Sequence, residues 1–292
     1  MASTLAVGLA VRPLDAYVGL AKPKGILPHL VTAAAAMTLA SGGAPAVSTL
    51  VLTLVGGGCV AAAANTFNSY LDRDIDALMA RTRNRPLPSG VLKPNQALAF
   101  GSMLGLAGVV VLSGFVDWLA ALLATEALAY YVLTYTLWLK RRTLWSTVIG
   151  SGIGVNPVLI GWTVVTHRLG LVPLLLSAII VSWTLPHFWT LAILKRDDYA
   201  RAGINVLPRR GVALWIVACS ALTAALSLAL IPLANLGILY AGTACLLGAG
   251  FLALAAGLTR EVSRRVARRL YTYSIAYIAV LFAAMIIDRF LA

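Results

Sequence analysis

The sequence has 292 residues, of which 60% are hydrophobic and only 11% are charged, and its mean hydropathy is +0.89. Apolar runs of about 20 residues, the length that a helix needs to cross a bilayer, recur along the whole chain and leave no room for a soluble domain. The net charge of +13 would indicate nucleic-acid binding in a soluble protein. In a membrane protein it is typical of basic cytoplasmic loops, so we expect no nucleic-acid partner.

The apolar runs predict an all-α polytopic membrane helical bundle with nine transmembrane helices, forming a single domain over residues 1–292. The approximate bounds of the nine spans are about 25–42, 48–71, 95–114, 118–138, 145–165, 171–194, 211–232, 237–258 and 270–289. Glycine and proline separate several of these runs, as at Gly42-Gly43 and Lys93-Pro94.

The distribution of Lys and Arg predicts the orientation of the bundle. When successive connections are assigned to alternate sides of the membrane, 21 of the 23 Lys and Arg residues lie on one side. Only Arg168 and Arg289 lie on the other. Because Lys and Arg accumulate in cytoplasmic loops, the N-terminus is expected in the cytoplasm and the C-terminus outside. The sequence therefore predicts a multi-pass protein of the cytoplasmic membrane.

The connection between the second and third spans concentrates charge in a chain that has little of it. Within NTFNSYLDRDIDALMARTRNRPLPSG, the residues Asn68, Asp72 and Asp76 are spaced i, i+4, i+8, which puts them on one face if the helix continues. An amide and two carboxylates are oxygen ligands that suit Mg²⁺, which commonly shares its coordination shell with phosphate. Arg81 and Arg85 could bind the same phosphates through bidentate hydrogen bonds. This connection is our candidate reaction centre, and it would face the cytoplasm.

A second acidic stretch, LKRDDYARAGINVLPRRG, lies between the sixth and seventh spans. Asp197 and Asp198 supply two adjacent carboxylates, and Lys195 and Arg201 supply nearby cations. The stretch could hold a second Mg²⁺ or form the other half of one diphosphate clamp. The alternative is an ordinary basic loop on the cytoplasmic side.

Longer strings resemble the UbiA superfamily of intramembrane prenyltransferases. DRDIDALMARTRNRPLPSG, together with the Asn68 row, is similar to the first signature of that superfamily. Four other strings are similar to its protoheme IX farnesyltransferase (haem O synthase) subfamily: AKPK, YTLWLKRRT, WTLPHFWTLAILKRDDYARAGINVLP and RLYTYSIAYIAVLFAAMIID. The chain departs from many superfamily members at Ala202, where a second DxxxD motif would have its second acid, so Asp197-Asp198 stands alone.

The resemblance implies transfer of a farnesyl group from farnesyl diphosphate to the 2-vinyl group of haem b, giving haem O and diphosphate. It implies Mg²⁺ held by Asn68, Asp72, Asp76 and Asp198, with Asp197 nearby, to neutralise the leaving group. The basic residues expected to bind the diphosphate are Arg81, Arg85, Lys140, Arg141, Lys195 and Arg201. The expected partners are the lipid bilayer, the two substrates and a haem A synthase-type enzyme downstream.

His187 follows Pro186 inside the sixth span. It could bind a backbone carbonyl that the proline leaves unpaired, or it could bind haem as an axial ligand or propionate partner. Trp183 and Trp189 could stack on the porphyrin or stabilise the isoprenoid cation, although each could equally be an interfacial anchor.

Two other functions remain open on the sequence. A relative acting on a quinone precursor or a chlorin would keep the same metal chemistry and change only the acceptor. A cation transporter would use acidic residues between helices, but it should place them near the middle of the bilayer at broken helices. Here the acids are concentrated at one membrane face.

Overall fold

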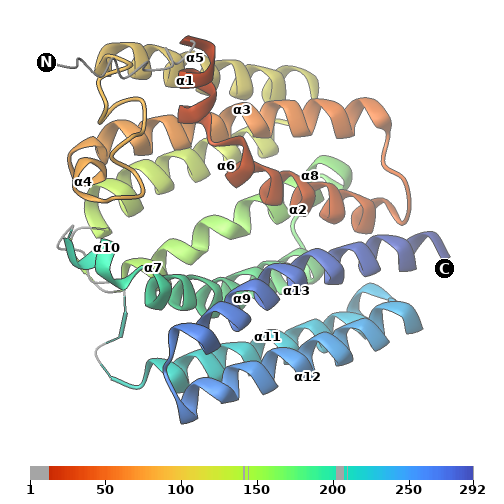
Figure 1. The fold of residues 1–292 in the computed structure, drawn as a ribbon. Helices are drawn as coiled ribbons and strands as arrows, with labels where there is room; N and C mark the ends of the chain where they lie inside the picture. The colour runs from red at the N-terminus through yellow and green to blue at the C-terminus, as the bar shows by residue number, and fades with distance from the viewer. Residues whose placement is uncertain (1–12, 141, 144, 202–206, 209, 292) are drawn as a thin grey trace, which may run out of the picture.

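The computed structural model describes residues 13–140, 142–143, 145–201, 207–208 and 210–291. Every regular element in this part of the chain is a helix, and Figure 1 shows most of them running between the same two ends of the molecule. Eight helices among the described residues are long and apolar enough to cross a membrane. The prediction of an all-α polytopic bundle is confirmed.

The structure contains helices of two kinds, long ones that form the bundle and short ones at its ends and breaks. The long helices are α2 (Pro23–Ser41), α3 (Val47–Leu71), α5 (Pro94–Phe115), α6 (Trp118–Ala129), α8 (Val155–Thr166), α9 (Leu171–Leu194), α11 (Val212–Ala234), α12 (Ile238–Arg260) and α13 (Arg264–Leu291). The short ones are α1 (Pro13–Ala21), α4 (Arg73–Leu78), the π-helix η1 (Tyr130–Leu139), α7 (Ser146–Gly150), the 3₁₀-helix η2 (Ser151–Gly154) and α10 (Arg196–Arg201).

The first predicted span corresponds to α2, which is not among the eight helices with sufficient hydropathy. Lys24, Pro28 and His29 lower the hydropathy of its first half. Its second half is nevertheless packed tightly against α8. A Cβ atom added to Gly161 would lie 2.2 Å from the carbonyl oxygen of Ala33, so only glycine allows the two backbones to approach this closely.

The first half of the chain packs α3 along α5 through small residues. A Cβ atom on Gly108 would lie 2.6 Å from the carbonyl oxygen of Gly56, so the two helices touch at their backbones. This close contact fixes α3, whose far end carries Asn68 and leads directly into α4. The rigidity of the α3–α5 pair therefore sets the position of the acidic row.

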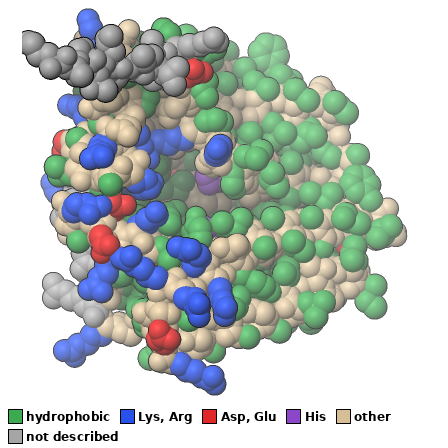
Figure 2. Space-filling view, viewed as in Figure 1, with side chains coloured by type: hydrophobic (Ala, Val, Ile, Leu, Met, Phe, Trp, Pro, Cys, Tyr) green, Lys and Arg blue, Asp and Glu red, His purple; other side chains and the backbone are tan. Residues whose placement is uncertain are grey.

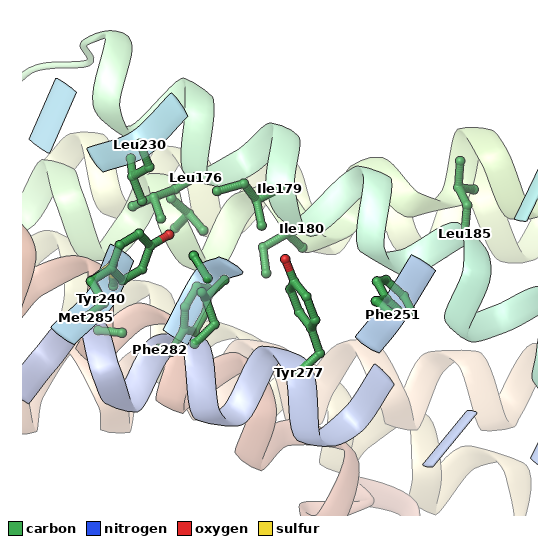
Figure 3. Close-up of a cluster of buried hydrophobic side chains, with 14 of the residues drawn as sticks. Leu176, Ile179, Ile180, Leu185, Leu230, Tyr240, Phe251, Tyr277, Phe282 and Met285 are labelled. Atoms are coloured by element: carbon green, nitrogen blue, oxygen red, sulfur yellow. The ribbon is translucent and has the colours of Figure 1, made fainter. Parts of the chain in front are cut away.

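The second half of the chain supplies most of one core, in which α9, α11, α12 and α13 meet (Figure 3) and which buried residues of α2 and α8 also join. Tyr240, Phe251 and Tyr277 are fully buried in it. The Tyr277 hydroxyl hydrogen-bonds the Ser227 hydroxyl at 2.9 Å, so the polar atom of this aromatic ring is satisfied inside the bundle. The core holds α9 against α13, and these two helices carry the aromatic cluster described below.

Three predicted spans differ from the observed helices. The predicted span 118–138 is α6 followed by the π-helix η1, and the predicted span 145–165 is broken into α7, η2 and α8. The last span was expected from about residue 270, but α13 begins at Arg264, so the basic residues of that connection lie on helical turns. Hydropathy cannot distinguish α, 3₁₀ and π hydrogen bonding, because all three bury similar side chains.

The charged connections gather at one end of the bundle. Figure 1 shows α4 and α10 at the same end although they are far apart in the sequence. Figure 2 shows Lys and Arg side chains concentrated along this edge, beside a hollow in which a histidine is visible. Hydrophobic side chains cover the rest of that face, as expected for a surface in contact with lipid.

Candidate active site

Asn68, Asp72 and Asp76 form a continuous row at the charged end of the bundle. α3 ends at Leu71 and α4 begins at Arg73, with Asp72 as the pivot between them. The Asp72 N–H donates to the Asn68 carbonyl at 2.9 Å, and the Asp76 N–H donates to the Asp72 carbonyl at 2.8 Å. Helical spacing therefore continues through the break, and all three side chains are buried.

Each member of this row contacts a cationic side chain. The Lys22 ammonium donates to Asn68 Oδ1 at 2.9 Å, and the Arg85 guanidinium donates to Asp76 Oδ2 at 2.7 Å. The Lys140 ammonium forms an ion pair with Asp72 Oδ2. Three cations thus surround two carboxylates, which makes the centre an attractive environment for an additional anion.

Lys140 reaches the row because of the π-helix η1. Its backbone N–H bonds the Tyr135 carbonyl five residues earlier at 2.9 Å, and the Thr136 hydroxyl bonds the Tyr131 carbonyl at 2.8 Å. Thr136 also accepts a hydrogen bond from the Asn68 amide at 3.2 Å. π-helical turns are rare and often occur at functional sites. Here the turn aligns one hydroxyl and one ammonium with the acidic row.

Tyr131 and Tyr135, on the same π-helix, stack their rings with centroids 5.6 Å apart. Tyr131 lies within range of the charges of Asp72 and Asp76. Aromatic faces beside a charged cluster are suited to stabilise a cation. Neither ring belongs to the acidic motifs that predicted the site, although Tyr135 begins the string YTLWLKRRT.

Lys22 contacts the acidic row, although it was not among the residues predicted for the site. It lies at the junction of α1 and α2 with φ 54° and ψ 58°, a left-handed conformation that costs a non-glycine residue energy and often marks functional positions. Burial lowers the pKa of Lys22 to about 7, and the Arg85 charge adds to this effect. The neighbouring Asp76 carboxylate opposes the shift. The signal in the sequence was AKPK, whose first lysine is Lys22.

The second acidic loop lies beside the first, and among the described residues its two carboxylates pair with arginines. Burial raises the pKa of Tyr199 on α10, and the Arg81 guanidinium of the first loop opposes that shift, so the two loops are close. Asp198 pairs with Arg201 three residues later, and Asp197 pairs with Arg264 of α13 at 2.7 Å.

The other predicted members of the two loops are less closely engaged. Lys195 caps the end of α9 and is exposed, and Arg81 is exposed. Arg141 and Ala202 lie outside the described residues.

The donor set fits a hard divalent cation only in part. No group of three or more His, Cys, Asp or Glu side chains within the described part of the chain is placed to hold a metal. The row does offer an amide oxygen and two buried carboxylates, and cationic N–H groups already contact all three. Mg²⁺ usually retains waters and completes its shell with substrate phosphates, so two carboxylates and one amide are sufficient protein ligands.

Of the residues predicted to bind haem, Trp183 and His187 lie together, whereas Trp189 lies elsewhere. Trp183 stacks on His187 with ring centroids 4.8 Å apart, and Trp183 Nε1 donates to the Ser274 carbonyl of α13 at 2.7 Å. His187 Nδ1 bonds the Ser274 hydroxyl of α13 at 2.8 Å rather than a backbone carbonyl. Trp189 is buried in the core of the second half. Two residues along a helix point to different sides, so Trp189 does not join the His187 cluster.

Comparison with known proteins shows the family of the chain. The model of the UbiA prenyltransferase family matches residues 29–285. The chain belongs to the UbiA prenyltransferase family. A protoheme IX farnesyltransferase from Symbiobacterium thermophilum is 42% identical over 278 residues, covering 93% of both chains. Those from Frankia alni (43%, covering 93% of this chain and 96% of the relative) and Leifsonia xyli (42%, 96% and 94%) are similar along the same length. The predicted resemblance is confirmed.

Solved UbiA-type structures share the fold. A structure of digeranylgeranylglyceryl phosphate synthase superposes with a TM-score of 0.80 at 19% identity, covering 96% of this chain and 99% of that one. The UbiA homolog from Aeropyrum pernix K1 gives 0.72 at 19% identity, covering 91% and 98%. The UbiA homolog from Archaeoglobus fulgidus bound to GPP and Mg²⁺ gives 0.63 at 16% identity, covering 92% and 99%.

In this UbiA-family chain, Lys22→Met should lower kcat/KM by about 10- to 150-fold, because a charge-assisted hydrogen bond contributes about 1.5–3 kcal/mol. The matched control is Lys24→Met, since Lys24 is exposed two residues away. Steady-state kinetics with varied prenyl diphosphate would measure both. Equal activity of the two variants would remove Lys22 from the site.

Proposed function

We propose that this chain transfers the farnesyl group of farnesyl diphosphate to the 2-vinyl group of haem b, in the branch that leads to haem A. One water is consumed, and the products are haem O, with a hydroxyethylfarnesyl group, and diphosphate. The observation that carries the proposal is the buried Asn68–Asp72–Asp76 row, held among three cations at one end of an apolar bundle. The full-length similarity to protoheme IX farnesyltransferases supports haem as the acceptor.

Asn68, Asp72 and Asp76 would hold Mg²⁺, which when bound neutralises charge on the departing diphosphate. The A. fulgidus homolog with GPP and Mg²⁺ supports this assignment. Asp198 and Asp197, in the adjacent loop, are the candidate ligands on the other side of the diphosphate. Their present partners are arginines, which suit phosphate equally well.

The cations around the row would bind the phosphates. Lys22, Arg85 and Lys140 now contact the row's oxygens, and a metal on those oxygens would release the three N–H donors toward the diphosphate. Four further basic residues are proposed for the same role: Arg81, Arg141, Lys195 and Arg201. These hydrogen bonds strengthen as negative charge moves onto the leaving group.

Breaking the C1–O bond leaves an allylic farnesyl cation and diphosphate. The tyrosine rings of η1 would face the cation, and the apolar bundle would exclude water from it until transfer. The π electrons of the 2-vinyl group then form the new C–C bond. Water adds to the cation that this creates beside the porphyrin, and it loses one proton. No strong general base is needed for the first step.

In the membrane, we place α2 as a ninth span, with the N-terminus in the cytoplasm and the C-terminus outside. The packing of α2 against α8 supports its membership of the bundle, and the positive-inside distribution supports the orientation. The chain then forms a single domain of the cytoplasmic membrane whose active site faces the cytoplasm, where diphosphate leaves. A haem A synthase-type enzyme would take the product.

The acceptor can be tested directly. Purified chain with Mg²⁺ and farnesyl diphosphate should convert haem b to the mass of haem O and leave a hydroxybenzoate unchanged. Prenylation of the hydroxybenzoate instead of haem would favour the quinone-type alternative. The cation-transport alternative predicts ion flux in vesicles without any new product mass, and the position of the acidic row at one end of the bundle argues against it.

A further inference from the structure

Three aromatic side chains on α9 and α13 enclose the imidazole of His187. Trp183 covers one face at 4.8 Å between ring centroids, with an interplanar angle of 19°. Tyr271 stacks on His187 at 4.7 Å and 24°. Phe188 meets the ring edge-on at 5.6 Å. The ring therefore has a fixed plane, and only its edges are available for polar contacts.

Ser274 fixes the tautomer of this ring. Its hydroxyl has one hydrogen, which it donates to the Tyr271 carbonyl at 2.7 Å. The same oxygen lies 2.8 Å from His187 Nδ1, so it must accept a hydrogen bond from Nδ1–H. In a neutral imidazole Nε2 then carries a lone pair. Within the described part of the chain, Nε2 has no hydrogen-bond partner.

An imidazole with Nδ1–H bonded to a second group and Nε2 exposed is the arrangement of a metal-ligating histidine. His187 is only half-buried, and Phe188 beside it is 43% exposed, so the free edge faces an accessible space. A structural histidine would be expected to satisfy both nitrogens inside an apolar bundle. The unused nitrogen indicates a ligand.

We infer that His187 is an axial ligand of the haem iron through Nε2, and that Ser274 is the residue that positions it. The inference rests on the proposed function, because haem b is the acceptor substrate there. Haem iron is commonly held by one histidine whose second ring nitrogen is hydrogen-bonded. Binding the iron would hold the porphyrin between α9 and α13 and limit the orientations that the vinyl group can adopt.

The start of α13 offers partners for the haem propionates. Arg264 and Arg268 lie on the same face of α13 as Tyr271, two turns and one turn earlier. Arg264 is engaged by Asp197, whereas Arg268 is exposed. Arg268 and Ser274 are separated by roughly 9 Å along the helix, a span compatible with the distance between haem iron and its propionates. The porphyrin would then have its carboxylates at the membrane surface and its iron inside.

Absorption spectroscopy of purified chain with haem b, without farnesyl diphosphate, tests the ligand. Wild type should show the bands of histidine-ligated haem. His187→Ala should lose them, and added imidazole should restore them by occupying the vacated space. His29→Ala is the matched control, since it removes another histidine that follows a proline in the bundle. Unchanged bands in His187→Ala would overturn the inference.

Variants of Ser274 distinguish a role in positioning His187 from a role that only joins α9 to α13. Ser274→Ala should weaken haem binding by about 10- to 100-fold and alter the bands, as loss of a hydrogen bond to a ligating histidine does. Ser274→Thr keeps the hydroxyl and should restore both. If Ser274 only joins α9 to α13, Ser274→Ala should lower the melting temperature and leave the haem bands unchanged. That result would overturn the positioning role.

The inference and the proposed function fail in different ways. If wild type makes haem O by mass while His187→Ala keeps the wild-type bands, only the axial-ligand inference is wrong. If wild type shows histidine-ligated haem but forms no haem O with farnesyl diphosphate and Mg²⁺, only the proposed reaction is wrong. Loss of affinity in Arg268→Ala, with the bands unchanged, supports the orientation of the propionates, and unaltered affinity overturns it.

Discussion

Asp72→Asn is expected to lower the rate of farnesyl transfer by at least about 100-fold, because it removes a charged oxygen ligand where the diphosphate must be neutralised. Asp72 is 1% exposed and sits at the junction of α3 and α4, so asparagine preserves its shape and its backbone hydrogen bonds. Asp74→Asn is the matched control, since Asp74 is exposed on α4, two residues after Asp72. Product mass and membrane insertion would be measured for both variants.

The ion pair between Asp72 and Lys140 allows a sharper version of this experiment. Removing one member of a buried pair destabilises a protein, because the other charge is left unpaired. The double variant Asp72→Asn/Lys140→Gln removes both charges and should recover folding while remaining inactive. If the double variant regained normal turnover, Asp72 would serve only to neutralise Lys140, and the proposed metal row would be wrong.

Removing divalent metal should stop the reaction. EDTA is expected to reduce haem O formation by about 100-fold or more, since a metal contributes several kcal/mol of charge stabilisation at the leaving group. Excess Mg²⁺ should restore it in wild type. EDTA does not act on the porphyrin-bound iron, so the substrate stays intact and product mass remains the readout.

The Asp72→Asn variant serves as the control for metal removal. Its low residual activity should respond little to EDTA or to added Mg²⁺, because the site has already lost a ligand. Full activity of wild type in EDTA would contradict the metal-held diphosphate. The charge on the diphosphate would then be neutralised by side chains alone, those of Lys22, Arg85 and Lys140.

The course of the chain through the bundle could be read largely from hydropathy. The span predicted at about 171–194 coincides with α9, and the one at about 48–71 differs from α3 by one residue. These helices are continuous, mostly apolar and free of Asp, Glu, Lys and Arg, so composition determines them. The α2 helix is harder to classify, because Lys24, Pro28 and His29 lower its hydropathy. Its place in the bundle depends on backbone contact at Gly161, which a hydropathy profile does not include.

Part of the candidate site could be predicted from the sequence because those residues are close together in the chain. Asn68, Asp72 and Asp76 are four residues apart, and local helical hydrogen bonds keep such residues on one face. Contacts between distant segments leave no such periodic signal. Lys22 meets Asn68 across 46 positions, and Ser274 meets His187 across 87. These contacts exist only once the helices have packed.

The π-helical segment Tyr130–Leu139 determines the direction of Lys140 through the backbone. Its hydrogen bonds join residues five apart, so each turn contains more residues than an α-helical turn. Replacing one side chain along the segment leaves the number of residues per turn unchanged. Losing or gaining a single residue can restore ordinary α-helical bonding, and the ammonium group would then point to another side of a helix that is still intact. The length of this segment is therefore under a constraint that residue identity does not reveal.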